Sequence, residues 1–172
     1  MIKLKIKLNE IIKVNALKKK IGNIQLIDND YNKLSISQRL GLLSLNIFTV
    51  SIKYKIVNSS DIIANYKMYA EGEQKCVISL SPVKFIVKKS FDIKFFDQKK
   101  IELSLLEDEF VEPIYNGEIN FYDIAVQMLS SFLDPYPKIN NGKIKLENFY
   151  KDKLETNKSK NNPFEVLNNL NK

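Results

Sequence analysis

Lysine alternates with apolar residues at the start of the chain. The apolar positions are Ile2, Leu4, Ile6 and Leu8, and the positions between them are Lys3, Lys5 and Lys7. Because successive side chains of a strand point to opposite faces, this alternation predicts a β-strand over residues 2–8. One face of that strand is expected to be dry, and the other is expected to carry the three lysines.

A short strand and a helix are predicted next. Ile24 and Leu26 mark the strand. Asp30 is expected to cap a helix that runs through Leu34 and Leu40, and Gly41 is expected to end it, because aspartate favours helix starts and glycine favours helix ends.

Three more strands follow in series, over residues 50–56, 62–70 and 85–95. A turn at 58–61 is expected between the first two, since its residues are Asn, Ser, Ser and Asp. The pattern places Lys53, Lys55, Lys88 and Lys94 on the polar faces of these strands. Lys89 falls on the dry face of the last one, so either a β-bulge restores the alternation there or the strand lies at a sheet edge.

A helix is predicted over residues 120–134. Its apolar positions recur three or four residues apart, and Pro135 is expected to stop it. Asn120 is the expected cap and Asp123 suits the first turn. The apolar positions are Phe121, Ile124, Ala125, Met128, Leu129 and Phe132. The fold class predicted from these elements is α+β, a curled and mostly antiparallel sheet covered by this helix.

The end of the chain changes in composition. Residues 138–162 are rich in lysine and asparagine and are expected to form a flexible linker. A short terminal helix is predicted over 163–172, with Phe164, Leu167 and Leu170 on one face. Such a helix is too small to stand alone and must dock on something. A single folded domain is therefore expected over residues 1–137.

The amino-acid composition argues against several kinds of catalytic and metal-binding site. The 172 residues include no histidine and one cysteine. Histidine is the commonest general base, and it also activates serine and cysteine nucleophiles, so its absence argues against an enzyme. The acidic cluster Glu107, Asp108 and Glu109 lies in a predicted loop and is interpreted as a solvated surface rather than a metal site. No catalytic, cofactor-binding or metal-binding residue is predicted.

The formal net charge is +7, which indicates a polyanionic partner or an anionic surface. Residues 1–100 carry most of the excess, and an acidic stretch lies between Glu102 and Glu118. No continuous apolar segment resembles a signal peptide or a membrane span, so the chain is expected to be cytoplasmic with no membrane partner.

Four short segments together resemble a known family. The run from Gln74 to Val83 is similar to a Cys-x-x-Cys-Leu-x-Pro segment between two strands in the YceD family, with Cys76, Leu80 and Pro82 matching and Ser79 in place of the second cysteine. The other segments are Arg39 to Leu45, then Leu133 with Asp134, Pro135, Tyr136 and Pro137, and finally Asn162, Pro163 and Phe164. The first two resemble an alphaproteobacterial branch of that family, and the last, which runs on to Leu167, resembles the closing Pro-Phe-x-x-Leu segment of the family. The cysteine cluster that suggests a metal site in many relatives is absent here.

The resemblance implies a role in the synthesis, processing or stability of large-subunit (23S) ribosomal RNA, and it implies no known reaction or catalytic residue. The expected partner is ribosomal RNA, a pre-ribosomal particle, or a ribosomal or processing protein, with no DNA expected. Lysine-rich strands favour direct RNA binding through Lys3, Lys5, Lys7, Lys53, Lys55, Lys88 and Lys94, provided that these strands are neighbours. The alternative is a protein-interaction adaptor that does not contact RNA.

Two motif segments have structural interpretations as well. Cys76, Ile78 and Leu80 are expected to alternate toward one side of a strand, which would bury the thiol, and Pro82 is expected to end or turn that strand. The segment from Leu133 to Pro137 is expected to form a stiff turn. It serves either as the helix stop or as a recognition corner anchored by Tyr136.

Overall fold

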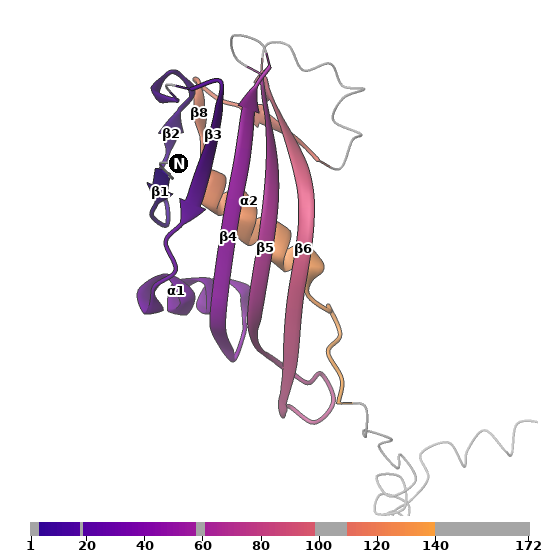
Figure 1. Ribbon diagram of the computed structural model, residues 1–172. Coiled ribbons are helices and arrows are strands. Elements are labelled where there is room, and N and C mark those ends of the chain that lie inside the picture. Colours follow the sequence, from indigo (N-terminus) through magenta and orange to yellow (C-terminus); the bar gives the residue numbers. More distant parts are fainter. Residues whose placement is uncertain (1–3, 18, 58–60, 99–109, 140–172) are drawn as a thin grey trace, which may run out of the picture. The chain divides into compact units, whose positions relative to one another are not determined.

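A computed structural model describes residues 4–17, 19–57, 61–98 and 110–139. Its main feature is a six-stranded sheet in the order β1-β3-β4-β5-β6-β7 (Figure 1). The strands are β1 (Leu4–Ile6), β3 (Ile21–Leu26), β4 (Ser44–Ile56), β5 (Ile62–Lys75), β6 (Pro82–Asp97) and β7 (Val111–Ile114). The inner four strands are antiparallel, whereas β1 and β7 pair in parallel with β3 and β6.

The three predicted central strands form a meander of β4, β5 and β6. Each is longer than its apolar alternation indicated, and β4 begins at Ser44 rather than at residue 50. The pairing of β4 with β5 shifts by one residue between Leu45 and Ile47, and this β-bulge interrupts the alternation that a sequence pattern needs. Most of the expected turn at 58–61 lies outside the described residues.

A second, two-stranded sheet lies near the start of the chain. It pairs β2 (Ile12–Lys13) with β8 (Glu118–Ile119), and a short 3₁₀ helix, η1 (Val14–Ala16), follows β2. The described part of the predicted first strand is β1, which ends at Ile6. Ile6 is fully buried, but Leu4 is exposed, so only part of the expected dry face is dry.

Helix α1 (Asp30–Leu40) is the predicted early helix with its cap one residue earlier than expected. Asn29, not Asp30, is the capping residue, and its Oδ1 accepts a hydrogen bond of 2.7 Å from the backbone N–H of Asn32. Gly41 ends the helix in the left-handed conformation with φ +66°, as its lack of a side chain allows. The caps thus bracket the helix that the sequence indicated.

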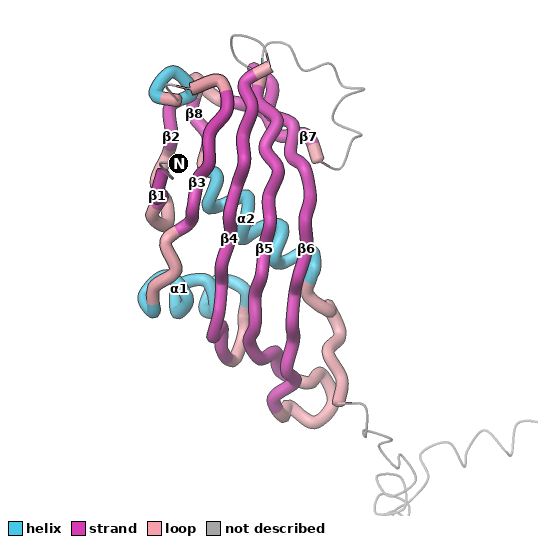
Figure 2. The backbone as a smooth tube through the Cα atoms, in the orientation of Figure 1, coloured by secondary structure: helices cyan, strands magenta, loops and turns pink. Residues whose placement is uncertain are grey.

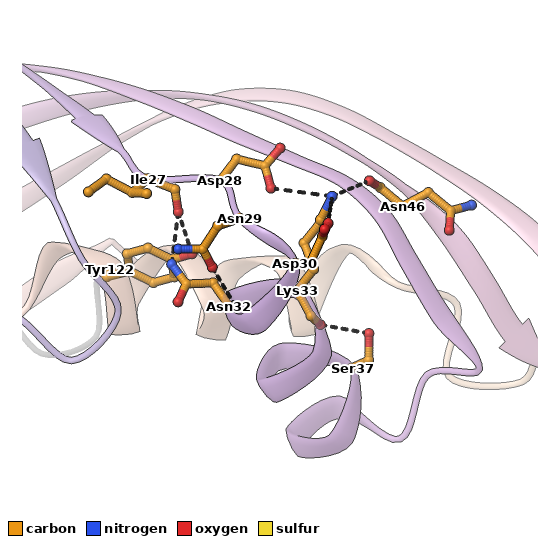
Figure 3. A network of polar contacts seen from close by, with 9 residues as sticks. All are labelled: Ile27, Asp28, Asn29, Asp30, Asn32, Lys33, Ser37, Asn46 and Tyr122. Carbon is orange, nitrogen blue, oxygen red and sulfur yellow. Dashed lines mark hydrogen bonds and ion pairs between the residues drawn. The ribbon is translucent and has the colours of Figure 1, made fainter.

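A polar network fixes α1 against the sheet and against α2 (Phe121–Phe132) (Figure 3). The backbone carbonyl of Ile27, which follows β3, accepts hydrogen bonds from Asn32 Nδ2 at 2.9 Å and from the Tyr122 hydroxyl at 3.3 Å. Lys33 reaches Asp30 at 3.1 Å and the backbone carbonyl of Asn46 at 3.0 Å. Because Asn32 and Tyr122 are both buried, these bonds satisfy polar groups that would otherwise cost free energy.

Helix α2 covers one face of the sheet, as predicted. Asn120 caps it by accepting a 2.9 Å hydrogen bond from the backbone N–H of Asp123. Phe121 and Phe132 pack edge-on against Phe95 and Phe91 of β6, with ring centroids 5.5 and 5.4 Å apart. After Phe132 the backbone becomes extended at Leu133, two residues before Pro135. The helix therefore begins and ends where its sequence signals lie.

Lys89 lies on the helix-facing side of β6 and no bulge accommodates it, because it pairs in regular register with Met68. Beyond the four residues that pair with β7, the outer edge of β6 has no described strand beside it. Of the two alternatives that the sequence pattern left open for Lys89, a β-bulge or an edge strand, the structure shows the edge strand. The Lys89 ammonium lies 5.7 Å from the centre of the Phe132 ring at the end of α2, within the range of a cation–π interaction.

The core lies between the sheet and the two helices, and the predicted α+β class is confirmed. One compact unit runs from Met1 to Lys138. Neither described helix is long and apolar enough to cross a membrane. The linker predicted over 138–162 lies almost entirely outside the described residues, and the terminal helix predicted over 163–172, with Pro163 and Phe164, lies wholly outside them.

Candidate nucleic-acid interface

The face of the sheet that points away from α2 is called here the outer face. In the described part of the chain, no helix or strand covers it (Figure 1). The strands that carry the predicted lysines are brought into one sheet, and the lysines on them share this face. Lys5, Lys53, Lys55, Lys88 and Lys94 are all exposed. The sequence-based prediction required these strands to be neighbours, and they are not, because β3 separates β1 from β4 and β5 separates β4 from β6. The five lysines nevertheless share one face of a single sheet.

The register arranges the outer face in rows across the strands. Lys55 of β4 and Lys94 of β6 share a row with Ile63 between them. Since neighbouring strands lie about 4.8 Å apart, the Cα atoms of these two lysines are separated by roughly 10 Å. Lys5 shares another row with Gln25, Ser51, Lys67 and Ser90. Lysines therefore extend across the face rather than along a single strand.

Lys67 of β5 was not selected from the sequence as a site residue. It is exposed in the middle of the outer face, between β4 and β6. The signal was present, because Lys67 occupies a polar position in the alternation over 62–70. Its importance depends on β5 being the central strand of the meander, which the alternation alone does not state.

Two of the predicted lysines remain. Lys3 lies outside the described residues. Lys7 lies just past the end of β1, where its backbone N–H donates a 2.8 Å hydrogen bond to the Glu10 carboxylate. The chain turns there, with Asn9 in the left-handed region at φ 63°, so the alternation of the first strand no longer fixes where Lys7 points.

A shallow hollow of about 500 Å³ lies on the outer face across β3, β4 and β5. Its polar lining consists of Asn23, Ser51, Lys53, Asn65 and Lys67. Within the described residues Lys53 and Lys67 form no ion pair, and the nearby Asp92 carboxylate accepts a 2.8 Å hydrogen bond from Asn65 Nδ2. The hollow thus presents ammonium, amide and hydroxyl groups, which suit phosphate oxygens.

Two aromatic residues lie at outer-face positions. Tyr69 is opposite Thr49 and Lys88, and its hydroxyl donates a hydrogen bond to the Glu71 carboxylate. Phe96 is opposite Pro113 of β7. Both rings are half-buried and neither belongs to the hydrophobic core.

The carboxylates on the outer face are unevenly placed. Glu71 and Glu73 lie toward the end of β5 that leads into Cys76, and Glu73 is opposite Lys84. The rows that hold Lys53, Lys55, Lys67 and Lys94 contain a single carboxylate, Asp92, at their strand positions. The positive charge is therefore concentrated toward the opposite end of the sheet.

Other titratable groups lie on the helix side of the sheet. Burial raises the pKa of the Glu112 carboxyl, and the charge of Asp123 raises it further. Burial also raises the pKa of the Tyr66 hydroxyl, which has no hydrogen-bond partner within the described residues. No group of three or more His, Cys, Asp or Glu side chains in the described part of the chain is arranged to hold a metal ion.

The two motif segments around Cys76 and Tyr136 lie together, at one end of the sheet. Residues 76–81 form the loop between β5 and β6, and the chain that follows α2 runs down to it (Figure 2). The backbone N–H of Val77 donates to the carbonyl of Pro137 at 3.0 Å, and Gln74 Nε2 donates to the carbonyl of Asp134 at 2.9 Å. Segments about 60 residues apart in sequence are thus joined by hydrogen bonds.

The strand expected over Cys76, Ile78 and Leu80 is wrong. Cys76 is buried as predicted, but Ile78 and Leu80 are exposed, because the chain turns tightly after Cys76. The Cys76 carbonyl accepts a hydrogen bond from Leu80 N–H, and the Cys76 N–H donates to the Ser81 carbonyl. Pro82 begins β6 rather than ending a strand. A short apolar alternation in a hairpin loop therefore resembles a strand without being one.

No protein-family model, curated protein or solved structure matches this chain. The similarity to the YceD family therefore rests on the four short segments alone, and it stays a prediction.

Proposed function

We propose that this chain is a non-enzymatic protein that binds single-stranded RNA through the outer face of its sheet. The observation that carries the proposal is the uncovered face, on which lysines from β1, β4, β5 and β6 are exposed together. Lysine binds phosphate as a point charge and distinguishes bases poorly, so contact is directed at the RNA backbone and depends weakly on sequence.

Single-stranded rather than duplex RNA suits this face for two reasons. A broad, open sheet presents a surface over which a flexible backbone can run. Tyr69 and Phe96 also lie at outer-face positions, where bases that are not paired can stack on aromatic rings. Stacking on Tyr69 would exchange part of its contact with Glu71 for contact with a base.

The biological role that we assign is support of the synthesis, processing or stability of large-subunit ribosomal RNA. This assignment comes from the resemblance of the four segments to the YceD family, and the cytoplasm is the compartment that it requires. The second candidate is a protein-interaction adaptor that does not contact RNA. The exposed apolar residues around the β5–β6 loop favour that candidate.

The test is RNA binding across a salt series, with Lys53, Lys55 and Lys67 changed together to glutamine. Each phosphate contact of single-stranded RNA contributes about −0.7 to the slope of log affinity against log salt. Loss of three contacts should therefore reduce the slope by about 2. The matched control changes Lys13, Lys19 and Lys89, which are exposed lysines outside the rows of the outer face, and it should keep the original slope.

An unchanged slope in the outer-face variant, or an equal change in the control, would contradict the assigned surface. Absence of binding even at low salt would favour the adaptor. The cellular role is tested separately, by measuring large-subunit ribosomal RNA after depletion and by crosslinking the protein to RNA. Normal levels of that RNA would contradict the ribosomal role, but they would not contradict the proposed RNA-binding surface.

A further inference from the structure

A cluster of apolar side chains is exposed at the end of the β5–β6 hairpin. Val77, Ile78 and Leu80 come from the hairpin loop, and Tyr136 comes from the segment after α2. We call these four residues the hairpin-end surface. Leu80 and Tyr136 are 61% and 70% exposed, which is unusual for large apolar side chains grouped in one place.

The backbone at Leu80 is strained. Its φ is +61°, in the left-handed region that leucine rarely adopts. The other described non-glycine residues with positive φ are Asn9 and Asn116, and asparagine tolerates this region well. Leu80 lies in the tight turn in which its N–H donates to the Cys76 carbonyl at 3.0 Å, and its side chain is not buried there. Backbone strain combined with an exposed apolar side chain is typical of a binding position.

Hydrogen bonds hold the hairpin-end surface in shape. The loop closes on itself through the bond from Cys76 N–H to the Ser81 carbonyl at 2.9 Å. The segment after α2 is fixed by the bond from Tyr136 N–H to Asp134 Oδ1 at 2.8 Å. Val77 joins the two segments through the Pro137 carbonyl. Because the anchors are already positioned, little ordering is needed when a partner binds.

The chemistry of this surface differs from that of the outer face. Three of its four side chains are aliphatic and have no ring on which a base can stack, so they do not suit RNA. Three exposed lysines, Lys75, Lys84 and Lys138, lie beside it along the chain. The two carboxylates nearest along the chain are Glu73, which is opposite Lys84, and Asp134, which accepts the backbone N–H of Tyr136, so positive charge is in excess. The surroundings therefore favour an acidic partner with apolar anchor residues.

We infer that the hairpin-end surface docks an acidic segment of another protein. Leu80 and Tyr136 contact the apolar residues of that segment, and Lys75 and Lys138 contact its carboxylates. This site is separate from the lysine rows of the outer face. The inference does not depend on the proposed RNA binding.

The experiment starts from the full-length chain, immobilised and exposed to a phage-displayed library of random 12-residue peptides. Enriched peptides are then synthesised and titrated into the chain and its variants. Leu80→Gly removes the anchor at a position where glycine suits the backbone, so the fold should be as stable as before or more so. Tyr136→Ala removes the second anchor from an exposed position. Leu34→Ala, at an exposed leucine of α1, is the matched control.

We expect the enriched peptides to combine aspartate or glutamate with apolar residues. Their affinity should fall at least about tenfold in Leu80→Gly and in Tyr136→Ala, as for central anchors of an interface, and stay unchanged in Leu34→Ala. Changing Lys75 and Lys138 to glutamine should weaken binding and reduce its salt dependence. RNA affinity should be the same in Leu80→Gly, Tyr136→Ala and Leu34→Ala, which keep every lysine.

Three outcomes would overturn the inference. The first is a lack of enriched acidic peptides, or equal binding of them to Leu80→Gly. The second is binding of the chain to phosphatidylglycerol vesicles that depends on Leu80, which would make the surface a membrane contact. The third is concentration-dependent dimerisation that Leu80→Gly abolishes, which would make a second copy the partner.

Discussion

The same strands form both faces of the sheet, but one face packs into the core and the other is exposed to solvent. Along β4, β5 and β6, every second side chain points toward the helix side of the sheet, and most of these side chains are buried, as for Ile52, Ala64 and Ile93. The side chains between them point outward and include Lys53, Lys67 and Lys94, all exposed. One alternation in the sequence therefore specifies both a core and a charged surface.

The difference shows which positions are constrained by folding. Substitution on the inner face changes close packing, whereas the outer face is solvated and tolerates many residues. Lysine on the outer face is not required by the fold, and its concentration there is the basis of the proposed RNA binding. The comparison also identifies Lys89 as the exception, since it is a lysine on the inner face.

The largest expected effect contrasts two isoleucines of β6. Ile93 is 1% exposed on the inner face, and Ile86 is 69% exposed on the outer face. Ile93→Ala should lower the free energy of unfolding by about 3 kcal/mol, because it leaves a cavity in the core. Ile86→Ala should change it by less than about 0.5 kcal/mol. Urea denaturation measures both, and equal losses would contradict the assignment of the two faces.

A smaller effect appears at high pH. Burial raises the pKa of the Tyr122 hydroxyl on the core side to about 12, from an ordinary value of 10.0. The unfolded chain therefore loses this proton first as the pH rises. The stabilisation by neutral Tyr122 is complete below pH 10 and is lost as the pH approaches and passes 12, by about 2–3 kcal/mol in total.

Tyr122→Phe tests this loss. The variant loses the hydrogen bond to the Ile27 carbonyl, so it should be less stable than the natural chain at neutral pH, by about 1 kcal/mol. The gap should close and reverse between pH 10 and 12, because phenylalanine cannot ionise. Tyr31→Phe, at an exposed tyrosine of α1, is the control and should leave the free energy of unfolding at neutral pH almost unchanged.

The smallest effect concerns Lys89. Lys89→Ala should cost about 0.5–1 kcal/mol, because it removes the cation–π interaction with Phe132. Lys88→Ala, next to it on the outer face, should cost less. Thermal unfolding of the two variants under identical conditions makes the comparison, and a greater loss in Lys88→Ala would contradict the assigned contact.

Lys89 also bears on self-association. Beside it the edge of β6 has no described neighbouring strand, and a charged residue pointing inward from an edge strand discourages pairing with another chain. Lys89→Val would restore an apolar inner face. We expect that variant to associate at concentrations where the natural chain does not, as measured by analytical ultracentrifugation.

Several features were decided by the sequence alone. Side-chain alternation is a local property of an extended backbone, so the dry and polar faces of β4, β5 and β6 follow from the order of residues. Helix ends are equally local, because Asn120 caps α2 through a residue three positions away and Gly41 adopts a conformation of its own. For this reason both helices were predicted to within one or two residues.

Other features were decided only by tertiary structure. Alternation does not say which strands are neighbours, so the surface shared by Lys5, Lys53, Lys67 and Lys94 appears only once the sheet is assembled. Leu80 matched the pattern of a strand, but closure of the β5–β6 hairpin placed it in a turn. Tyr136 belongs to the segment that follows α2, which hydrogen bonds join to the same hairpin. These contacts join residues distant in sequence, and the physical forces that select them act through the packed core, where a local pattern carries no information about partners.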